Sequence, residues 1–167
     1  MKKTFLPFCL SLAMIPAVVN AQTEKKAPGW AGLEPVQTKS FYLNDISTRA
    51  TGDFLKRYPK GTDPKWYKID DGYFVKFGLN DIQQKAVYDK TGSWVYSIKY
   101  YKENKLPRDI RHIVKRQYYD YTITQVEELH YQNNPVAYIV HMQDEKSWMN
   151  VKVCEGELSI LEKFTKG

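Results

Sequence analysis

The spacing of hydrophobic residues predicts two amphipathic helices along the chain. From residue 46, apolar side chains recur at every fourth position, which places them on one helix face; they are Ile46, Ala50, Phe54 and Tyr58. Pro59 ends this helix because proline disfavours helical geometry in the residue before it. A second helix begins near Leu106-Pro107, and its apolar positions step by three and four; they are Ile110, Ile113, Val114 and Tyr118.

Each helical stretch is followed by runs in which apolar and polar residues alternate, and short turn sequences separate these runs. Alternation with a period of two is typical of strands with one buried face. Four strands are predicted after the first helix, at residues 66–69, 73–77, 82–88 and 93–101, and four after the second, at 121–129, 136–142, 147–153 and 157–164. Turns this short imply antiparallel neighbours, since a parallel pair needs a long crossover.

The order of one helix and four strands therefore occurs twice. Residues 54–57 (Phe-Leu-Lys-Arg) in the first half parallel residues 113–116 (Ile-Val-Lys-Arg) in the second. We interpret the pattern as two repeats, at residues 46–101 and 106–164. The predicted fold class is α+β, a tandem duplication of one helix packed on a four-stranded antiparallel sheet.

Strand alternation also predicts which side chains lie beneath the helices. Within residues 147–153 the covered side chains are Met149, Val151 and Val153. The side chains of the opposite, open face are Trp148, Asn150 and Lys152. Matching residues 86–88 to 150–152 places Val87 on the covered face and Tyr88 on the open one.

The first 43 residues do not continue these patterns. Lys2 and Lys3 precede a mostly apolar stretch that ends at Val19-Asn20-Ala21, so residues 1–21 are predicted to be a signal peptide. The apolar stretch is shorter than the ~20 residues of a membrane span. Residues 22–43 contain Pro and Gly without periodicity and are expected to form an exposed lead-in to one domain at 44–167. Cleavage near Ala21 would give a periplasmic or secreted protein.

Charge and cysteine content narrow the classes of function. The chain has 25 Lys and Arg against 19 Asp and Glu, without a long block of like charge. With a secreted location, this mild excess makes nucleic acid an unexpected partner. Beyond the predicted signal peptide the single cysteine is Cys154, so the fold does not depend on an internal disulfide.

No motif predicts catalysis, a metal or a cofactor. The three histidines, His112, His130 and His141, lack the i, i+4 spacing of a helical zinc site. Cys154 has no sequence signature that pairs it with a catalytic base. The acidic pairs at 70–71 and 127–128 fall in a turn or point to opposite strand faces. We therefore expect a protein that is not an enzyme, with no cofactor and no metal.

Two features remain as indications of binding. Lys-Arg pairs at residues 56–57 and 115–116 end both helices, where they either complement the helix dipole or attract an acidic partner. The chain also has 13 Tyr, 4 Trp and 7 Phe. Aromatic residues suit strands in general, but Tyr and Trp are also enriched in protein interfaces. The predicted partner-binding residues are Tyr73, Tyr88, Trp94, Trp148 and Lys152.

An ordered series of short segments resembles a known family. The segments are residues 54–59 (Phe-Leu-Lys-Arg-Tyr-Pro), 63–66 (Asp-Pro-Lys-Trp), 71–77 (Asp-Gly-Tyr-Phe-Val-Lys-Phe) and 88–94 (Tyr-Asp-Lys-Thr-Gly-Ser-Trp). They look like the PepSY-like, β-lactamase-inhibitor-protein-like secreted domain of bacteria, and the resemblance covers most of residues 46–164. The second half departs from it, because Cys154-Glu155-Gly156 replaces an Asp-x-x-Gly turn.

The resemblance implies a tandem helix-plus-sheet fold, secretion and a non-enzymatic role. It also implies a concave, aromatic sheet face of the kind with which the similar inhibitor holds its enzyme. The sequence hypothesis is therefore a periplasmic or secreted binding module, of the protein-binding or protease-inhibitor type, for an unknown protein or peptide of the cell envelope. The alternative is a small-molecule carrier or envelope sensor with a pocket between the helices and the sheet. Partner identity and oligomeric state are left open.

Overall fold

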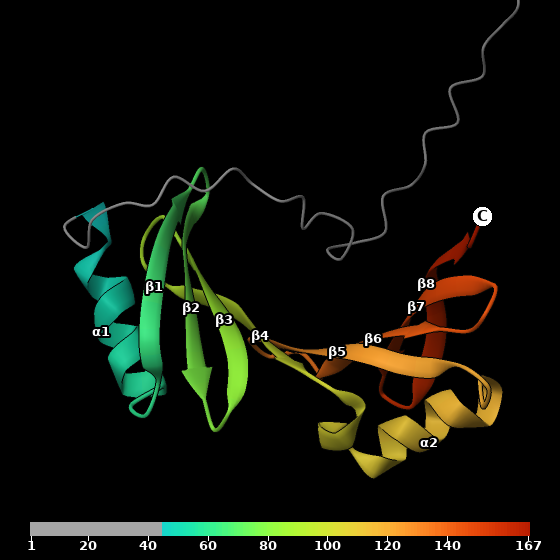
Figure 1. The fold of residues 1–167 in the computed structure, drawn as a ribbon. Coiled ribbons are helices and arrows are strands. Elements are labelled where there is room, and N and C mark those ends of the chain that lie inside the picture. The colour runs from blue at the N-terminus through green and yellow to red at the C-terminus, as the bar shows by residue number, and fades with distance from the viewer. Residues whose placement is uncertain (1–44) are drawn as a thin grey trace, which may run out of the picture. The chain divides into compact units, whose positions relative to one another are not determined.

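The computed structural model describes residues 45–167, and the predicted signal peptide and lead-in lie outside them. The chain runs through one helix, four strands, a second helix and four further strands (Figure 1). The first group is α1 (Thr48–Arg57), β1 (Thr62–Ile69), β2 (Gly72–Leu79), β3 (Ile82–Asp89) and β4 (Trp94–Tyr101). A short 3₁₀ helix, η2 (Glu103–Lys105), precedes the second group, which is α2 (Arg108–Gln117), β5 (Thr122–Tyr131), β6 (Ala137–Gln143), β7 (Ser147–Cys154) and β8 (Glu157–Thr165).

All eight strands belong to one antiparallel sheet with the order β1 to β8. The strands β4 and β5 pair from Tyr96↔Tyr131 to Tyr101↔Val126, so the hydrogen bonding continues across the middle of the sheet. The predicted fold class, a tandem duplication of a helix on a four-stranded sheet, is therefore wrong. A separate four-stranded sheet would leave the backbone groups of β4 and β5 unpaired, and their pairing removes both of these edges.

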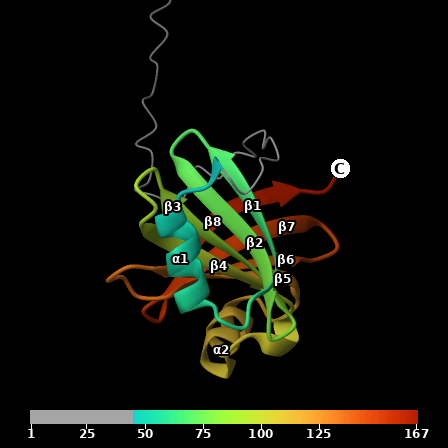
Figure 2. The same ribbon diagram turned by 90° about the vertical axis from the view of Figure 1, so that its left-hand side faces the viewer.

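Both helices lie on the same face of the sheet. The α1 helix buries Ala50 and Phe54 against β1–β3, in a cluster with Trp66, Phe77 and Tyr88. This packing can be followed in Figure 2, where α1 lies in front of the first strands. The α1 helix also follows the predicted apolar stripe, since Ile46 is buried and Tyr58 packs against the cluster.

The α2 helix packs over the second half of the sheet in the same way. It buries Ile110 and Val114 against β5–β7, while Ile113 and Tyr118 pack at the edge of the cluster. The strand side of this cluster is mostly aliphatic and includes Val126, Val140, Met142, Met149, Val151 and Val153. The predicted covered side chains Met149, Val151 and Val153 are confirmed.

The sheet is bent, and both helices lie on its convex side (Figure 1). Two-residue turns with positive backbone φ join several strands, as at Asn80-Asp81 and Glu155-Gly156. This geometry matches the right-handed twist of paired strands.

Because both helices lie on the convex side of the sheet, the opposite face is concave (Figure 1). No other element of the described chain covers it. We call it the open face.

Candidate functional site

The open face is the candidate functional site, and the strand register defines its members. Side chains that alternate with the helix-covered residues point to it from β1 to β8. Its aromatic and aliphatic members include Tyr67, Phe74, Val87, Tyr96, Ile98, Tyr100, Leu129, Tyr131, Ile139 and Trp148. Its charged and polar members include Lys76, Lys85, Glu127, His141, Asn150 and Lys152.

Tyrosines gather at the centre of the open face, where β4 and β5 pair. Tyr96 and Tyr131 are direct partners across the two strands, and their rings stack with centroids 5.0 Å apart. Ile98 and Leu129 are also direct partners and are buried, although no helix covers them. Burial raises the pKa of Tyr96 to about 12, and it also raises the pKa of Tyr131. These side chains are thus packed against one another and partly shielded from water, although no helix or second sheet of the described chain covers them.

Two lysines lie side by side next to this centre. Lys76 and Lys85 are direct cross-strand partners on β2 and β3, and neither makes an ion pair with a described residue. The Lys85 ammonium lies 4.5 Å from the centroid of the Phe74 ring, which in turn stacks on Tyr67 at 4.6 Å. Burial and the nearby charge of Lys76 lower the pKa of Lys85. Like charges directly opposite each other destabilise a sheet, so this pair is not explained by folding.

The second half of the open face carries paired rather than unpaired charges. His141 Nε2 lies 3.0 Å from Glu127 Oε1, and the two side chains are 31% and 17% exposed. The hydrogen bond to Glu127 raises the pKa of His141. Asn150 Nδ2 donates to Glu162 Oε2 at 2.9 Å. This region presents a fixed polar surface beside the aromatic centre.

Two of the five predicted partner-binding residues lie on the open face. Trp148 pairs in register with Gln143 and Phe164, is 50% exposed, and donates its indole N–H to Gln143 Oε1 at 2.9 Å. Lys152 lies opposite Ile139 on β6. Their predicted placement on the open face, together with that of Asn150, is confirmed, and their role in binding stays a prediction.

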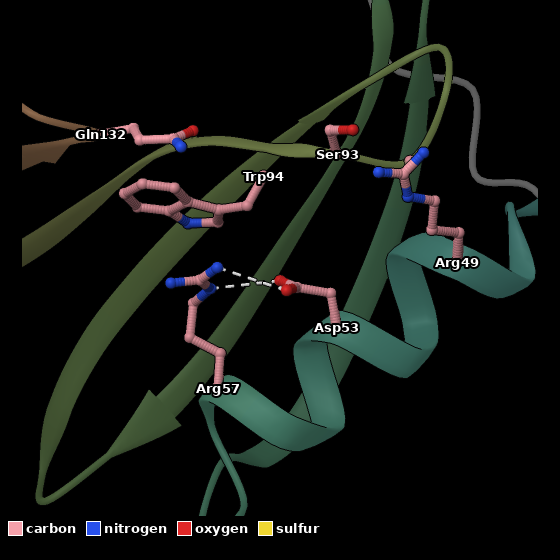
Figure 3. A pocket seen from close by; sticks show the side chains of 7 residues that line it. Arg49, Asp53, Arg57, Ser93, Trp94 and Gln132 are labelled. Carbon is pink, nitrogen blue, oxygen red and sulfur yellow. Dashed lines mark hydrogen bonds and ion pairs between the residues drawn. The ribbon is translucent and has the colours of Figure 1, made fainter.

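The other three lie on the helix-covered face. Tyr88 is fully buried beneath α1, so its predicted open-face position is wrong, as is the covered position of Val87. Tyr73 packs against the α1 cluster, and the face of the Trp94 ring lies against the Arg57 guanidinium, whose Cζ is 4.5 Å from the ring centroid (Figure 3). The error at Tyr88 came from matching the two halves one residue out of step, which exchanges the two faces of a strand.

The residues considered for catalysis are dispersed. His130 pairs with Glu128 at 2.5 Å on the helix-covered face, whereas His141 lies on the open face. Cys154 is a half-buried free cysteine at the end of β7. Within residues 45–167, no group of three His, Cys, Asp or Glu residues is arranged to hold a metal ion.

The Lys-Arg pairs at the helix ends differ in their contacts. Arg57 forms an ion pair with Asp53 at 3.1 Å, and Lys115 donates to the backbone carbonyl of Tyr121. Both contacts are made within the chain, so neither requires an acidic partner. The helices of the described range are also too short and polar to cross a membrane.

Sequence reasoning missed the central residues of the open face, namely Tyr96, Tyr100, Tyr131, Lys76 and Lys85. A signal was present in β4, where Tyr96, Ile98 and Tyr100 follow a period of two. This alternation did not show which aromatic residues of β4 lie on the open face. Tyr101 directly follows Tyr100 in the sequence but is buried on the helix-covered face.

Solved structures of bacterial proteins share this fold. A BLIP-like protein from Bacteroides fragilis matches with a TM-score of 0.63 at 20% identity, over 74% of this chain and 88% of its own. A DUF2874 family protein from Bacteroides uniformis matches with a TM-score of 0.62 at 13% identity, over 72% and 89%. A protein from Bacteroides eggerthii that is provisionally described as periplasmic matches with a TM-score of 0.61 at 12% identity, over 72% and 88%.

These identities are low, so the structural matches establish the fold and not the function. A scan against protein-family models finds no match, and neither does a search of curated proteins. The resemblance to the BLIP-like class is thus supported by structure, while the PepSY-like part of the resemblance stays a prediction.

Proposed function

We propose that the protein is a non-enzymatic binding module of the bacterial cell envelope whose open face holds a protein partner. The observation that carries the proposal is the packed aromatic centre of a concave face that no other described element covers. Tyr and Trp are enriched in the cores of protein interfaces, where they contribute much of the binding energy. The BLIP-like neighbour and the neighbour described as periplasmic support the same class and location.

The charges of the open face indicate the chemistry of the partner. The unpaired Lys76 and Lys85 favour an acidic side chain of the partner between them. Lys76 is exposed and Lys85 is half-buried, and an ion pair with Lys85 is screened less by solvent than one on an open surface. The partner is therefore a secreted or periplasmic protein with a protruding segment that carries both a carboxylate and apolar side chains.

Site-specific photo-crosslinking in intact cells tests this proposal. A benzophenone amino acid replaces Tyr100 on the open face or, as the control, Leu55, which is 67% exposed on α1. We expect one defined crosslinked product from position 100 and none of the same mass from position 55. Equal products from both positions, or none from position 100, would contradict binding at the open face.

A second comparison separates affinity from folding. The variant Trp148→Ala/Lys85→Met is expected to lose the crosslink at position 100 while keeping the unfolding temperature of the wild type within a few degrees. Tyr119→Ala, which changes an 81% exposed aromatic residue beyond α2, serves as the matched control and is expected to retain the crosslink. Retention by both variants would show that the crosslinked protein does not use this face.

The alternative of a carrier with an apolar pocket between helices and sheet has less support. Both helices place their apolar side chains directly against the strands, in two packed clusters. A ligand of the size of a lipid or a steroid would have to displace these side chains.

A further inference from the structure

A cavity of about 340 Å³ lies beside α1, outside the open face. It is lined by Arg49, Asp53 and Arg57 of α1, by Gly92, Ser93 and Trp94 around the start of β4, and by Gln132 after β5. Figure 3 shows the α1 side chains pointing toward Trp94 and Ser93, with Gln132 at the far side. The volume is at the lower end of the range for small-ligand sites, ~300–1,000 Å³.

One arginine of the cavity is held in place. Arg57 donates from Nε and Nη2 to the two carboxylate oxygens of Asp53 at 3.1 and 3.2 Å. Its guanidinium also lies over the Trp94 ring, 4.5 Å from the centroid. The hydrogen bond to Asp53 raises the pKa of Arg57. The Arg57 guanidinium is therefore a positive charge held in one position. Asp53 accepts from two of its five N–H groups, so the other three can donate to a ligand.

The second arginine has no partner of its own. No hydrogen bond or ion pair joins the Arg49 guanidinium to another described residue. The carboxylate nearest to it along the β3–β4 turn, Asp89, already accepts from the Thr91 hydroxyl at 2.6 Å and from the Ser93 backbone N–H at 2.9 Å. The hydrogen bonds from Thr91 and Ser93, and to a smaller extent the charge of Arg49, lower the pKa of Asp89. Arg49 thus lies near one carboxylate but presents a guanidinium whose N–H groups have no hydrogen-bond acceptor among the described residues.

One further donor of the lining lacks an acceptor. The indole N–H of Trp94 is buried and has no hydrogen-bond partner among the described residues. Asp53 is the one carboxylate among the lining residues, and Arg57 occupies both of its oxygens.

The walls of the cavity are fixed relative to each other. Gly92 has a φ of +81°, and a Cβ at this position would lie 2.9 Å from the Ala50 backbone nitrogen and 2.6 Å from Ser47 Oγ. The β3–β4 turn is therefore in close contact with the first turn of α1. This contact brings the backbone of the turn against the backbone of α1, so the two walls of the cavity are packed together.

We infer that this cavity binds the oxyanion head group, carboxylate or phosphate, of a small ligand between Arg49 and Arg57. The lining supplies two guanidinium groups against one carboxylate, which Arg57 already occupies, so the missing component is an acceptor with negative charge. Arginine favours planar, bidentate contacts with such groups. The site is independent of the proposed partner binding at the open face.

Titration by NMR tests the inference on the full chain. The indole N–H resonance of Trp94, assigned by its loss in Trp94→Phe, is followed while inorganic phosphate or succinate is added at constant ionic strength and pH. We expect a saturable shift with at least one probe. Saturation by succinate alone identifies a carboxylate ligand, and saturation by phosphate alone identifies a phosphorylated one.

The variants make the test specific. Arg49→Gln is expected to weaken binding at least about tenfold, and Arg49→Lys, which keeps the charge without the planar fork, less than that. Arg108→Gln changes an exposed arginine at the start of α2 and is the matched control, with unchanged affinity expected. A shift that does not saturate with either probe, or one that saturates equally in wild type and Arg49→Gln, would overturn the inference.

Discussion

The two faces of the same sheet differ in how their side chains are covered. The helix-covered face is filled by side chains such as Val140, Val151 and Phe77, which are almost completely buried beneath α1 and α2. The open face is lined by tyrosines and lysines that cover one another only in part. Both faces contain buried residues, but only the first is sealed by other elements of the described chain.

The difference shows how one strand contributes side chains both to the core and to the face of the proposed binding site. On β7, Val151 and Val153 belong to the core, while Trp148 and Lys152 reach the open face. Because successive side chains of a strand point to opposite sides, substitutions one residue apart can act on separate properties. Stability is expected to depend on the helix-covered face and partner affinity on the open face.

The largest expected effect is on the helix-covered face, for Phe54→Ala. The Phe54 ring is buried and contacts Phe77, Tyr58 and Trp66, with ring centroids 5.0, 5.5 and 5.6 Å away. Its removal leaves a cavity beneath α1 and is expected to lower the free energy of unfolding by about 3–5 kcal/mol, measured by urea denaturation.

Trp148→Ala is the matched aromatic truncation on the open face. Because Trp148 is 50% exposed, its loss is expected to change stability by less than about 1 kcal/mol. A loss comparable to that of Phe54→Ala would show that both faces contribute equally to folding and would remove the distinction between them.

An intermediate effect is expected from a charged cluster on the helix-covered face, around Glu128. Glu128 accepts from Lys99 Nζ at 2.6 Å and from the Tyr101 hydroxyl at 2.6 Å, and it pairs with His130. Burial by itself would raise the pKa of Glu128, but the hydrogen bonds from His130, Lys99 and Tyr101 outweigh it and lower the pKa to about 2.

A lowered folded-state pKa stabilises the protein above the unfolded pKa, and this stabilisation is lost as the pH falls. For Glu128 the loss is expected between pH 4.5 and about 2, and it amounts to no more than about 3 kcal/mol. Urea denaturation across this pH range measures it, and Glu128→Gln is expected to remove this part of the pH dependence. An identical slope in the variant would exclude Glu128 as its source.

The smallest expected effect has the opposite sign and lies on the open face. Lys85→Met keeps the aliphatic stem over Phe74 and removes a half-buried charge that faces Lys76. We expect it to stabilise the protein by up to about 1 kcal/mol in urea denaturation while weakening partner binding. Destabilisation would mean that the cation over Phe74 contributes more to folding than the repulsion from Lys76 removes.

Local sequence patterns predicted most elements of the described chain. The four-residue spacing gave α1, and the steps of three and four gave α2 with Ile110 and Val114 buried, as observed. Alternation placed Met149, Val151 and Val153 under α2. These predictions succeeded because they depend on periodicity, which is a property of neighbouring residues.

The candidate site was predicted only in part, because its residues come from strands far apart in the sequence. Trp148 and Lys152 were found from the alternation of a single strand. The stacking of Tyr96 on Tyr131 and the facing of Lys76 and Lys85 depend on strand register. Tyr88 was misplaced because a shift of one residue in a strand exchanges its two faces.

By itself the sequence determined where helices and strands form, since backbone preferences and apolar periodicity act over a few residues. Only the tertiary structure decided that the eight strands make one sheet instead of two, through the pairing of β4 with β5 across the intervening α2. That pairing places both helices on one face and leaves the other concave and uncovered. Long-range hydrogen bonding, which no local pattern encodes, therefore created the surface on which the proposed function depends.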